Sequence, residues 1–172
     1  MRKNAWRKGC AVSDAKRLYL LDGTALVYRA YFAFIRNPLI NSKGENTSAP
    51  FGFVSALLKI VREEAPDYLA VVFDSAQPTF RHERFPAYKA TRERMPEELV
   101  AQLPRIDQIV EAFGVPIVRL DGFEADDLIG TLAVQGQNAG LDVTIVTGDK
   151  DLMQLVNDRV RILAPGKTKN EW

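Results

Sequence analysis

Short apolar runs alternate along the chain with segments in which apolar residues recur every three or four positions. The three strongest runs are rich in Leu, Val, Ile, Tyr and Phe, and two weaker runs accompany them. The strong runs cover 18–21, 68–73 and 143–146, and the weak ones cover 115–119 and 160–163. Runs of this length and composition are typical of buried strands.

Helical periodicity fills the intervals between these runs, at 25–35, 51–64, 97–113, 125–138 and 150–156. Because strands alternate with helices, we expect an α/β fold with a mainly parallel central sheet flanked by helices. Two polar stretches, 37–50 and 77–96, interrupt the alternation and are expected to be loops. A loop as long as the second one is usually functional or mobile.

The composition agrees with one compact domain over residues 18–172, preceded by a flexible basic tail over 1–17. Of the 172 residues, 47% are hydrophobic and 26% are charged, and the formal net charge is +1. Such a balanced total is compatible with a local basic patch. Cys10 is the only cysteine, so no internal disulfide can form and a reducing compartment is expected. Since neither a signal peptide nor a membrane span is recognisable, we expect a cytoplasmic protein with no membrane partner. We also expect the protein to be a monomer.

Acidic residues stand where the predicted strands end. Asp22 closes the run LYLLDG, Asp74 closes LAVVFD, and Asp149 follows VTIVTG. The carboxyl ends of parallel strands lie at one edge of a sheet, where ligands bind in open α/β folds. Each residue by itself also has a structural explanation, because Asp22 before Gly23 is a common turn pair and aspartates cap helix starts.

Further acids extend this set into a candidate metal site. Three of them in FEADDLIG can reach one pocket from a single helical turn, and another follows in TGDKDLMQL. Capping does not require acids on several strand ends together with pairs at two helix starts, so the coincidence favours a metal cluster. The predicted ligands are Asp22, Asp74, Glu124, Asp126, Asp127, Asp149 and Asp151. Oxygen ligands suit Mg²⁺ or Mn²⁺, and two such ions would serve phosphodiester hydrolysis.

The segment QPTFRHERFPAYKATRERMP, which follows directly after Asp74, interleaves basic and aromatic side chains. Basic groups neutralise phosphates and aromatic rings accept unstacked bases, as expected where single-stranded nucleic acid passes. A solvated charged loop with anchoring aromatic rings is the alternative. The candidate DNA-binding residues are Arg81, Arg84, Tyr88, Lys89 and Arg92.

Two of these basic residues are also expected to take part in catalysis. Lys89 and Arg92 would face the same way on a helix, and we expect them to hold the scissile phosphate and to stabilise charge in the transition state. His82, the only histidine, is expected to be a solvated residue rather than a catalyst.

Four ordered motifs, YLLDGTALVYRAYFA, VVFDSAQPTFRHERFPAYKATR, LDGFEADDLIGTLA and VTGDKDLMQLV, resemble the 5′-nuclease and flap endonuclease family. The resemblance extends from Arg17 to Trp172 and is strongest to the amino-terminal 5′-3′ exonuclease domains of bacterial DNA polymerase I. It implies a PIN-like fold and two Mg²⁺ ions bound by the seven acids. It also implies removal of 5′ flaps and RNA primers in DNA replication and repair. Tyr88, Lys89 and Arg92 match the family's YK-x-x-R element, where a helical arch near 77–96 meets the site and a 5′ single strand passes beneath it.

The family pattern continues beyond the last residue of this sequence. It includes a further pair of metal-binding aspartates and a helix-hairpin-helix region that grips duplex DNA. We therefore expect a complete first metal site and an impaired second one. Two alternatives to a DNA nuclease stay open, namely a non-catalytic DNA-binding remnant and a PIN-type ribonuclease.

Overall fold

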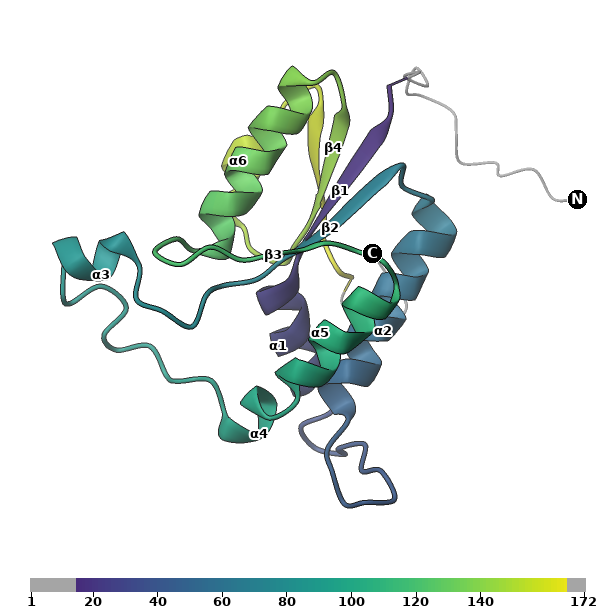
Figure 1. Cartoon of the computed structure of the whole chain (residues 1–172), viewed down its shortest axis with the longest axis vertical. Coiled ribbons are helices and arrows are strands. Elements are labelled where there is room, and N and C mark those ends of the chain that lie inside the picture. The colour runs from purple at the N-terminus through teal and green to yellow at the C-terminus, as the bar shows by residue number, and fades with distance from the viewer. Residues whose placement is uncertain (1–14, 167–172) are drawn as a thin grey trace, which may run out of the picture.

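Five parallel strands form a single sheet at the centre of the protein (Figure 1). The structure is a computed structural model that describes residues 15–166. The strands are β1 (Arg17–Asp22), β2 (Tyr68–Val72), β3 (Ile117–Val118), β4 (Asp142–Val146) and β5 (Val160–Leu163). Their order across the sheet is β3-β2-β1-β4-β5, and every neighbouring pair is parallel. From β1 the chain adds β2 and β3 on one side of this strand, and then β4 and β5 on the other. The strand order therefore reverses at β1, which is a topological switch point, where ligands bind in open α/β sheets.

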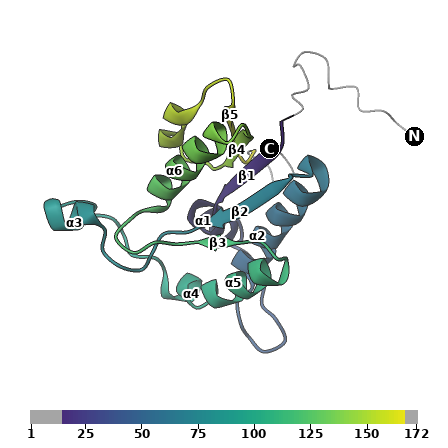
Figure 2. The same cartoon turned by 45° about the horizontal axis from the view of Figure 1, so that its top comes forward.

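Side chains of β1 alternate between the two faces of the sheet, because successive strand residues point to opposite sides. Tyr19 and Leu21 enter a core cluster shared with α1 (Gly23–Ala33), α2 (Ser48–Lys59) and α5 (Leu103–Ala112). Leu20 enters a second cluster shared with α6 (Ala125–Asn138). Figure 2 shows α6 on one side of the strands and α2 and α5 on the other. The predicted α/β fold, with a parallel sheet covered on both faces, is confirmed.

The predicted strands agree closely with the observed ones. The three strong apolar runs form β1, β2 and β4, and the weak run 160–163 forms β5. The other weak run, 115–119, pairs only over the two residues of β3. Apolar runs therefore located the strands well, apart from the length of the strand at the sheet edge.

Three predicted helices differ from the observed ones. The helix predicted at 51–64 begins earlier, at Ser48, and ends in a π-helical turn, η1 (Ile60–Glu64). The helix predicted at 97–113 is divided into α4 (Glu97–Val100) and α5. The division follows from Pro104, which lacks the N–H that would bond the carbonyl of Val100. The segment predicted as a helix at 150–156 forms a 3₁₀ turn, η2 (Asp151–Leu155).

The predicted loop at 77–96 contains a short helix, α3 (Phe80–Arg84), which projects away from the sheet (Figure 1). The N–H of Thr79 donates to Nδ1 of His82 at 3.1 Å, so the imidazole caps the start of α3. His82 is half-buried, and the prediction that it is a solvated residue is wrong.

The helix expected to align Lys89 with Arg92 is not formed. Pro86 follows α3 closely and has no N–H to continue it. The residues after Pro86 form turns, and Lys89 adopts a left-handed backbone conformation with φ 52°. The arch segment in this structure therefore consists of one short helix followed by turns.

No helix in residues 15–166 is both long and apolar enough to cross a membrane. The predicted basic tail lies mostly outside the described residues. Arg17, its last residue, is the first residue of β1.

Candidate functional site

Three aspartates follow strands at the carboxyl edge of the sheet. Asp22 is the last residue of β1 and is 4% exposed, while Asp74 and Asp149 come shortly after β2 and β4. One carboxylate oxygen of Asp22 accepts the N–H of Ala25 at 3.0 Å and thereby caps α1. The other accepts the hydroxyl of Thr147 at 2.7 Å. Asp22 is thus fixed from β1, α1 and the loop after β4.

The first turn of α6 brings further acids to this edge. The carboxylate of Asp74 accepts the N–H of Ala125 at 2.7 Å, which joins the end of β2 directly to α6. Glu124 and Asp127 form a reciprocal capping box, in which the carboxylate of Asp127 accepts the N–H of Glu124 at 3.0 Å. Asp126 lies between them and is half-buried.

Four of the acids repel one another, and we call them the aspartate cluster: Asp22, Asp74, Asp126 and Asp149. Burial raises the pKa of Asp126 from 3.8 to about 6, together with the negative charges of the other three. Burial also raises the pKa of Asp22, and the charges of Asp74 and Asp149 add to the effect. Grouped carboxylates of this kind are stabilised when a divalent cation neutralises them.

The other three predicted ligands are placed differently. Glu124 and Asp127 are bound to basic side chains, and Asp151 is exposed with its N–H donating to a carboxylate oxygen of Asp149 at 2.9 Å. Within residues 15–166, no three His, Cys, Asp or Glu side chains are arranged so that they could hold a metal ion in this conformation. The oxygen donors and repulsion of the aspartate cluster fit a hard divalent cation, although a ligand geometry is not formed. Metal binding by the seven acids therefore stays a prediction.

Glu124 is bound by the first two residues of the YK-x-x-R element. The ammonium of Lys89 donates to one carboxylate oxygen of Glu124 at 2.8 Å, and the hydroxyl of Tyr88 donates to the other at 3.1 Å. Burial opposes the charge on Lys89, but its interactions with Glu124 and Tyr88 outweigh this effect and raise the pKa of Lys89. Lys89 is therefore cationic beside the aspartate cluster.

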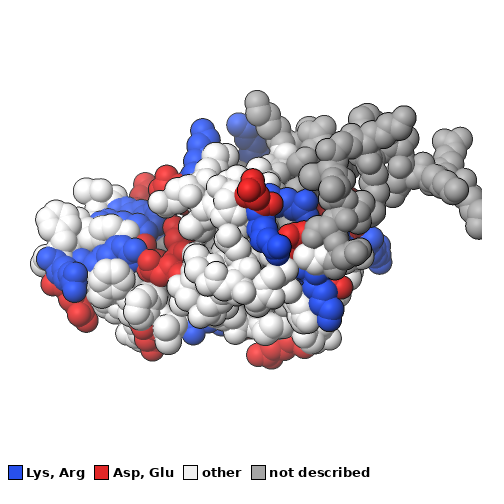
Figure 3. Space-filling view, turned by 90° about the horizontal axis from the view of Figure 1, so that it is seen from above, with Lys and Arg blue, Asp and Glu red and all other residues white. Residues whose placement is uncertain are grey.

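The two arginines of α3 differ in their contacts. Arg81 donates to both carboxylate oxygens of Asp127 at 2.7 Å and lies 3.7 Å from Glu124. The hydrogen bonds from Arg81 lower the pKa of Asp127. Arg84 is exposed, with its guanidinium 5.9 Å from the centroid of the Phe80 ring. Figure 3 shows acidic atoms (red) gathered beside basic atoms (blue) on the side of the protein where α3 lies.

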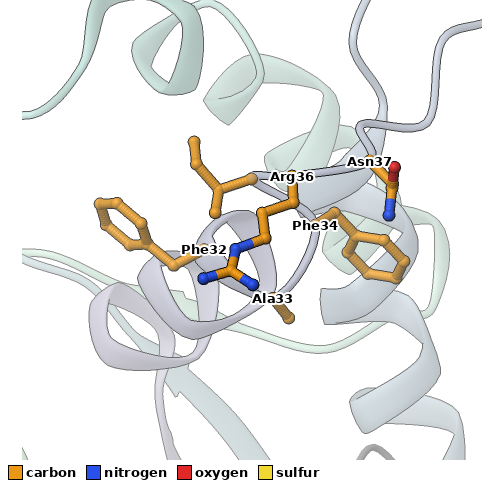
Figure 4. A pocket seen from close by; sticks show the side chains of 6 residues that line it. Phe32, Ala33, Phe34, Arg36 and Asn37 are labelled. Carbon is orange, nitrogen blue, oxygen red and sulfur yellow. The ribbon is translucent and has the colours of Figure 1, made fainter.

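A small hollow of about 130 Å³ opens between the arch segment and the acids, and its charged lining residues are Asp74, Lys89, Arg92 and Glu124. Cations and carboxylates thus share one surface depression. A larger hollow of about 360 Å³ lies at the end of α1 (Figure 4). There Arg36 lies between the rings of Phe32 and Phe34, and none of the lining residues is acidic. The smaller hollow, which is lined by both acids and cations, is therefore the candidate functional site.

Two threonines that the sequence pattern did not mark hold the aspartates in place. Thr147 is fully buried, and its hydroxyl binds Asp22 and accepts the N–H of Asp149 at 3.0 Å. The hydroxyl of Thr24 accepts the N–H of Asp74 at 3.0 Å. In VTGDKD the threonine stands two residues before an acid, a spacing that favours the local bond between Thr147 and Asp149. The bond between Thr24 and Asp74 joins residues far apart in sequence, so no local pattern could have identified it.

Residues 17–172 match the family described as 5′-3′ exonuclease, N-terminal resolvase-like domain. The chain belongs to this 5′-3′ exonuclease family. DNA polymerase I of Treponema pallidum is 49% identical over 152 residues, which are 88% of this chain and 15% of that protein. DNA polymerase I of Chloroflexus aurantiacus is 50% identical over 145 residues, 84% of this chain and 15% of that protein. The exonuclease-family domain described here thus spans 15% of the length of each of these relatives.

Solved structures show the same fold. The T5 5′-exonuclease with bound zinc superimposes with a TM-score of 0.68 at 22% identity, over 87% of this chain and 55% of that one. The bacteriophage T5 flap endonuclease with DNA and metal ions gives a TM-score of 0.66 at 23% identity, over 87% and 55% of the two chains. The predicted PIN-like fold and the predicted family are both confirmed.

Proposed function

We propose that this domain is a divalent-metal-dependent nuclease that hydrolyses DNA phosphodiester bonds at 5′ single-stranded ends and flaps. The observation that carries the proposal is the aspartate cluster at the carboxyl edge of the parallel sheet, where burial of Asp126 and the charges of the other three aspartates raise the pKa of Asp126 to about 6. Membership of the 5′-3′ exonuclease family supports it. So does the shared fold of T5 nucleases, which have been solved with metal ions and DNA.

The aspartate cluster would hold the first ion, and release of Lys89 would let Glu124 contribute. Asp127 would contribute through the remaining lone pairs of oxygens that stay bonded to Arg81. Mg²⁺ suits the oxygen donors, Mn²⁺ is an alternative, and we expect two ions in the complete site. When bound, the ions would lower the pKa of a water molecule and offset negative charge on the phosphate. The hydroxyl of Thr147 would keep Asp22 oriented throughout, because it is buried and already bonded to that carboxylate.

Lys89 and Arg92 would bind the scissile phosphate in the small hollow that both line. Lys89 is bound to Glu124 before substrate enters, so it would exchange this carboxylate for a phosphate oxygen. Its raised pKa keeps it cationic for that purpose. Tyr88 and the exposed Arg84 would contact the single strand that approaches the hollow, through a ring face and a cation respectively.

In the context of a complete polymerase, this activity would remove 5′ flaps and RNA primers during DNA replication and repair. The proposal extends to RNA–DNA hybrids, because positioning of a phosphate by cations and metal ions does not depend on the sugar.

Cleavage of a 5′-flap DNA by the purified chain tests the proposal. We expect cutting with Mg²⁺, none with EDTA, and none by Asp74→Ala, whose fold is checked by circular dichroism. Asp158→Ala, which alters an exposed aspartate in the turn before β5, is the matched control and should cut like the parent. Cutting that persists in Asp74→Ala would remove the acids from the mechanism. Cutting of single-stranded RNA alone would identify a ribonuclease, and binding without cutting would identify a DNA-binding remnant.

A further inference from the structure

Arg81 joins α3 to α6 through a bidentate ion pair. Two of its N–H groups donate to the two carboxylate oxygens of Asp127, each at 2.7 Å, and the side chains are 31% and 24% exposed. Next to this pair, the N–H of Phe80 donates to the carbonyl of Gly122 at 3.0 Å. The centroids of the Phe80 and Phe123 rings also lie 5.7 Å apart. Three interactions therefore attach α3 to the first turn of α6 and to the residues just before it.

The residues between α3 and Lys89 are in turn bonded back to α3. The N–H of Phe85 donates to the carbonyl of Arg81 at 2.9 Å, and the N–H of Tyr88 donates to the carbonyl of Phe85 at 2.8 Å. The ring of Tyr88 packs edge-on against His82 at 5.4 Å. Because Lys89 has a left-handed backbone outside any helix, its place depends on these contacts.

We propose that Arg81 is a positioning residue, which fixes α3 through Asp127 and thereby holds Lys89 against Glu124 beside the aspartate cluster. Arg81 was expected to contact DNA, but in this structure its guanidinium binds both carboxylate oxygens of Asp127, which assigns it to holding α3 in place. Lysine cannot reproduce this planar, two-bond geometry. The kinetic consequences rest on the proposed nuclease function, whereas the effect on the placement of Lys89 does not.

A double-mutant cycle on kcat measures whether Arg81 acts through Lys89. Arg81→Ala should lower kcat about tenfold in the parent but less than about twofold in the Lys89→Ala background, because residues that act together couple. Arg84→Ala removes the same charge from the same helix without touching Asp127. Arg84→Ala should therefore change kcat by the same factor in the parent and in the Lys89→Ala background.

The salt dependence of flap-DNA binding separates positioning from phosphate contact. The logarithm of the binding constant falls linearly with the logarithm of the salt concentration. Loss of one phosphate contact makes this slope less steep by about 0.7 for single strands. Lys89→Ala should show this decrease, and adding Arg81→Ala in that background should change the slope no further, because Arg81 makes no phosphate contact of its own. Thermal unfolding of each variant confirms that the compared proteins are folded at the assay temperature.

The reactivity of Lys89 towards an acetylating reagent, followed by mass spectrometry, reports its placement without any nuclease activity. Arg81→Ala should raise the rate of Lys89 acetylation severalfold and leave that of the exposed Lys43 unchanged. Additive kcat effects with a further decrease in slope in the Lys89→Ala background would make Arg81 a DNA contact. Unchanged Lys89 reactivity would make the ion pair purely fold-stabilising. Either result overturns the inference. If the parent cuts no DNA, the proposed function fails, and the Lys89 reactivity still decides the role of Arg81.

Discussion

Replacing Asp126 with asparagine removes one charge from the aspartate cluster while nearly preserving its shape. The pKa of Asp126 is about 6 in the folded protein, against an ordinary value of 3.8. An acid with a raised folded pKa stabilises the fold below its unfolded pKa, and this stability is lost as the pH rises through the folded value. The difference between the two pKa values corresponds to a loss of about 3 kcal/mol in the free energy of unfolding when Asp126 is ionised. Because Asp126 is only half-buried, we reduce this to about 1.5 kcal/mol for solvent screening.

Thermal unfolding of the parent and of Asp126→Asn in EDTA, between pH 4.5 and pH 8, measures the stability that is lost when Asp126 is ionised. The variant should gain stability relative to the parent as the pH rises to about 6, and the gap should then stay constant. A gap of about 1.5 kcal/mol corresponds to a Tm higher by about 3–6 °C for a domain of this size. Added Mg²⁺ should stabilise the parent more than the variant, because it neutralises the same charge. A variant less stable than the parent at pH 8 in EDTA would refute the electrostatic reasoning.

Three further substitutions probe separate parts of the structure. Lys89→Ala should slow flap cleavage about a hundredfold without weakening Mn²⁺ binding, because it removes a cation from the phosphate and not an oxygen ligand; equal cleavage rates would exclude Lys89 from the mechanism. Thr147→Val removes the hydroxyl donor of the buried Asp22 and should lower the free energy of unfolding by about 1–3 kcal/mol in guanidinium titrations; an unchanged midpoint would mean that this bond contributes nothing. Gly23→Ala would place a Cβ 2.5 Å from the ring of Phe73 and should cost about 1–3 kcal/mol through overpacking; a Tm equal to that of the parent would show that the ring moves aside freely.

Much of the fold was predictable because buried parallel strands have a simple signature. The runs that became β1, β2 and β4 are apolar on both faces, and each is followed by an aspartate that the parallel arrangement brings to the same edge. Asp22, Asp74 and Asp149 could therefore be expected together from residue type and strand order. Asp126 joins them from the first turn of α6, where its burial and their charges raise its pKa.

Other features depend on contacts that no local pattern encodes. Arg81 and Asp127 are far apart in sequence, and both were expected to face substrate or metal, yet they bind each other. Likewise, His82 caps α3 only because Thr79 begins a helix there, in a stretch that its polar composition marks as a loop. Such pairings depend on how the arch segment folds back onto α6, which is a tertiary arrangement.

Direct titration of Mn²⁺, followed by electron paramagnetic resonance, asks whether the carboxyl edge of the sheet binds divalent ions. The parent and Asp158→Asn should bind Mn²⁺ alike, and Asp74→Asn should bind it at least about tenfold more weakly, a loss of about 1.4 kcal/mol. Equal binding by all three proteins would contradict the assignment of the aspartates and, with it, the metal-dependent nuclease.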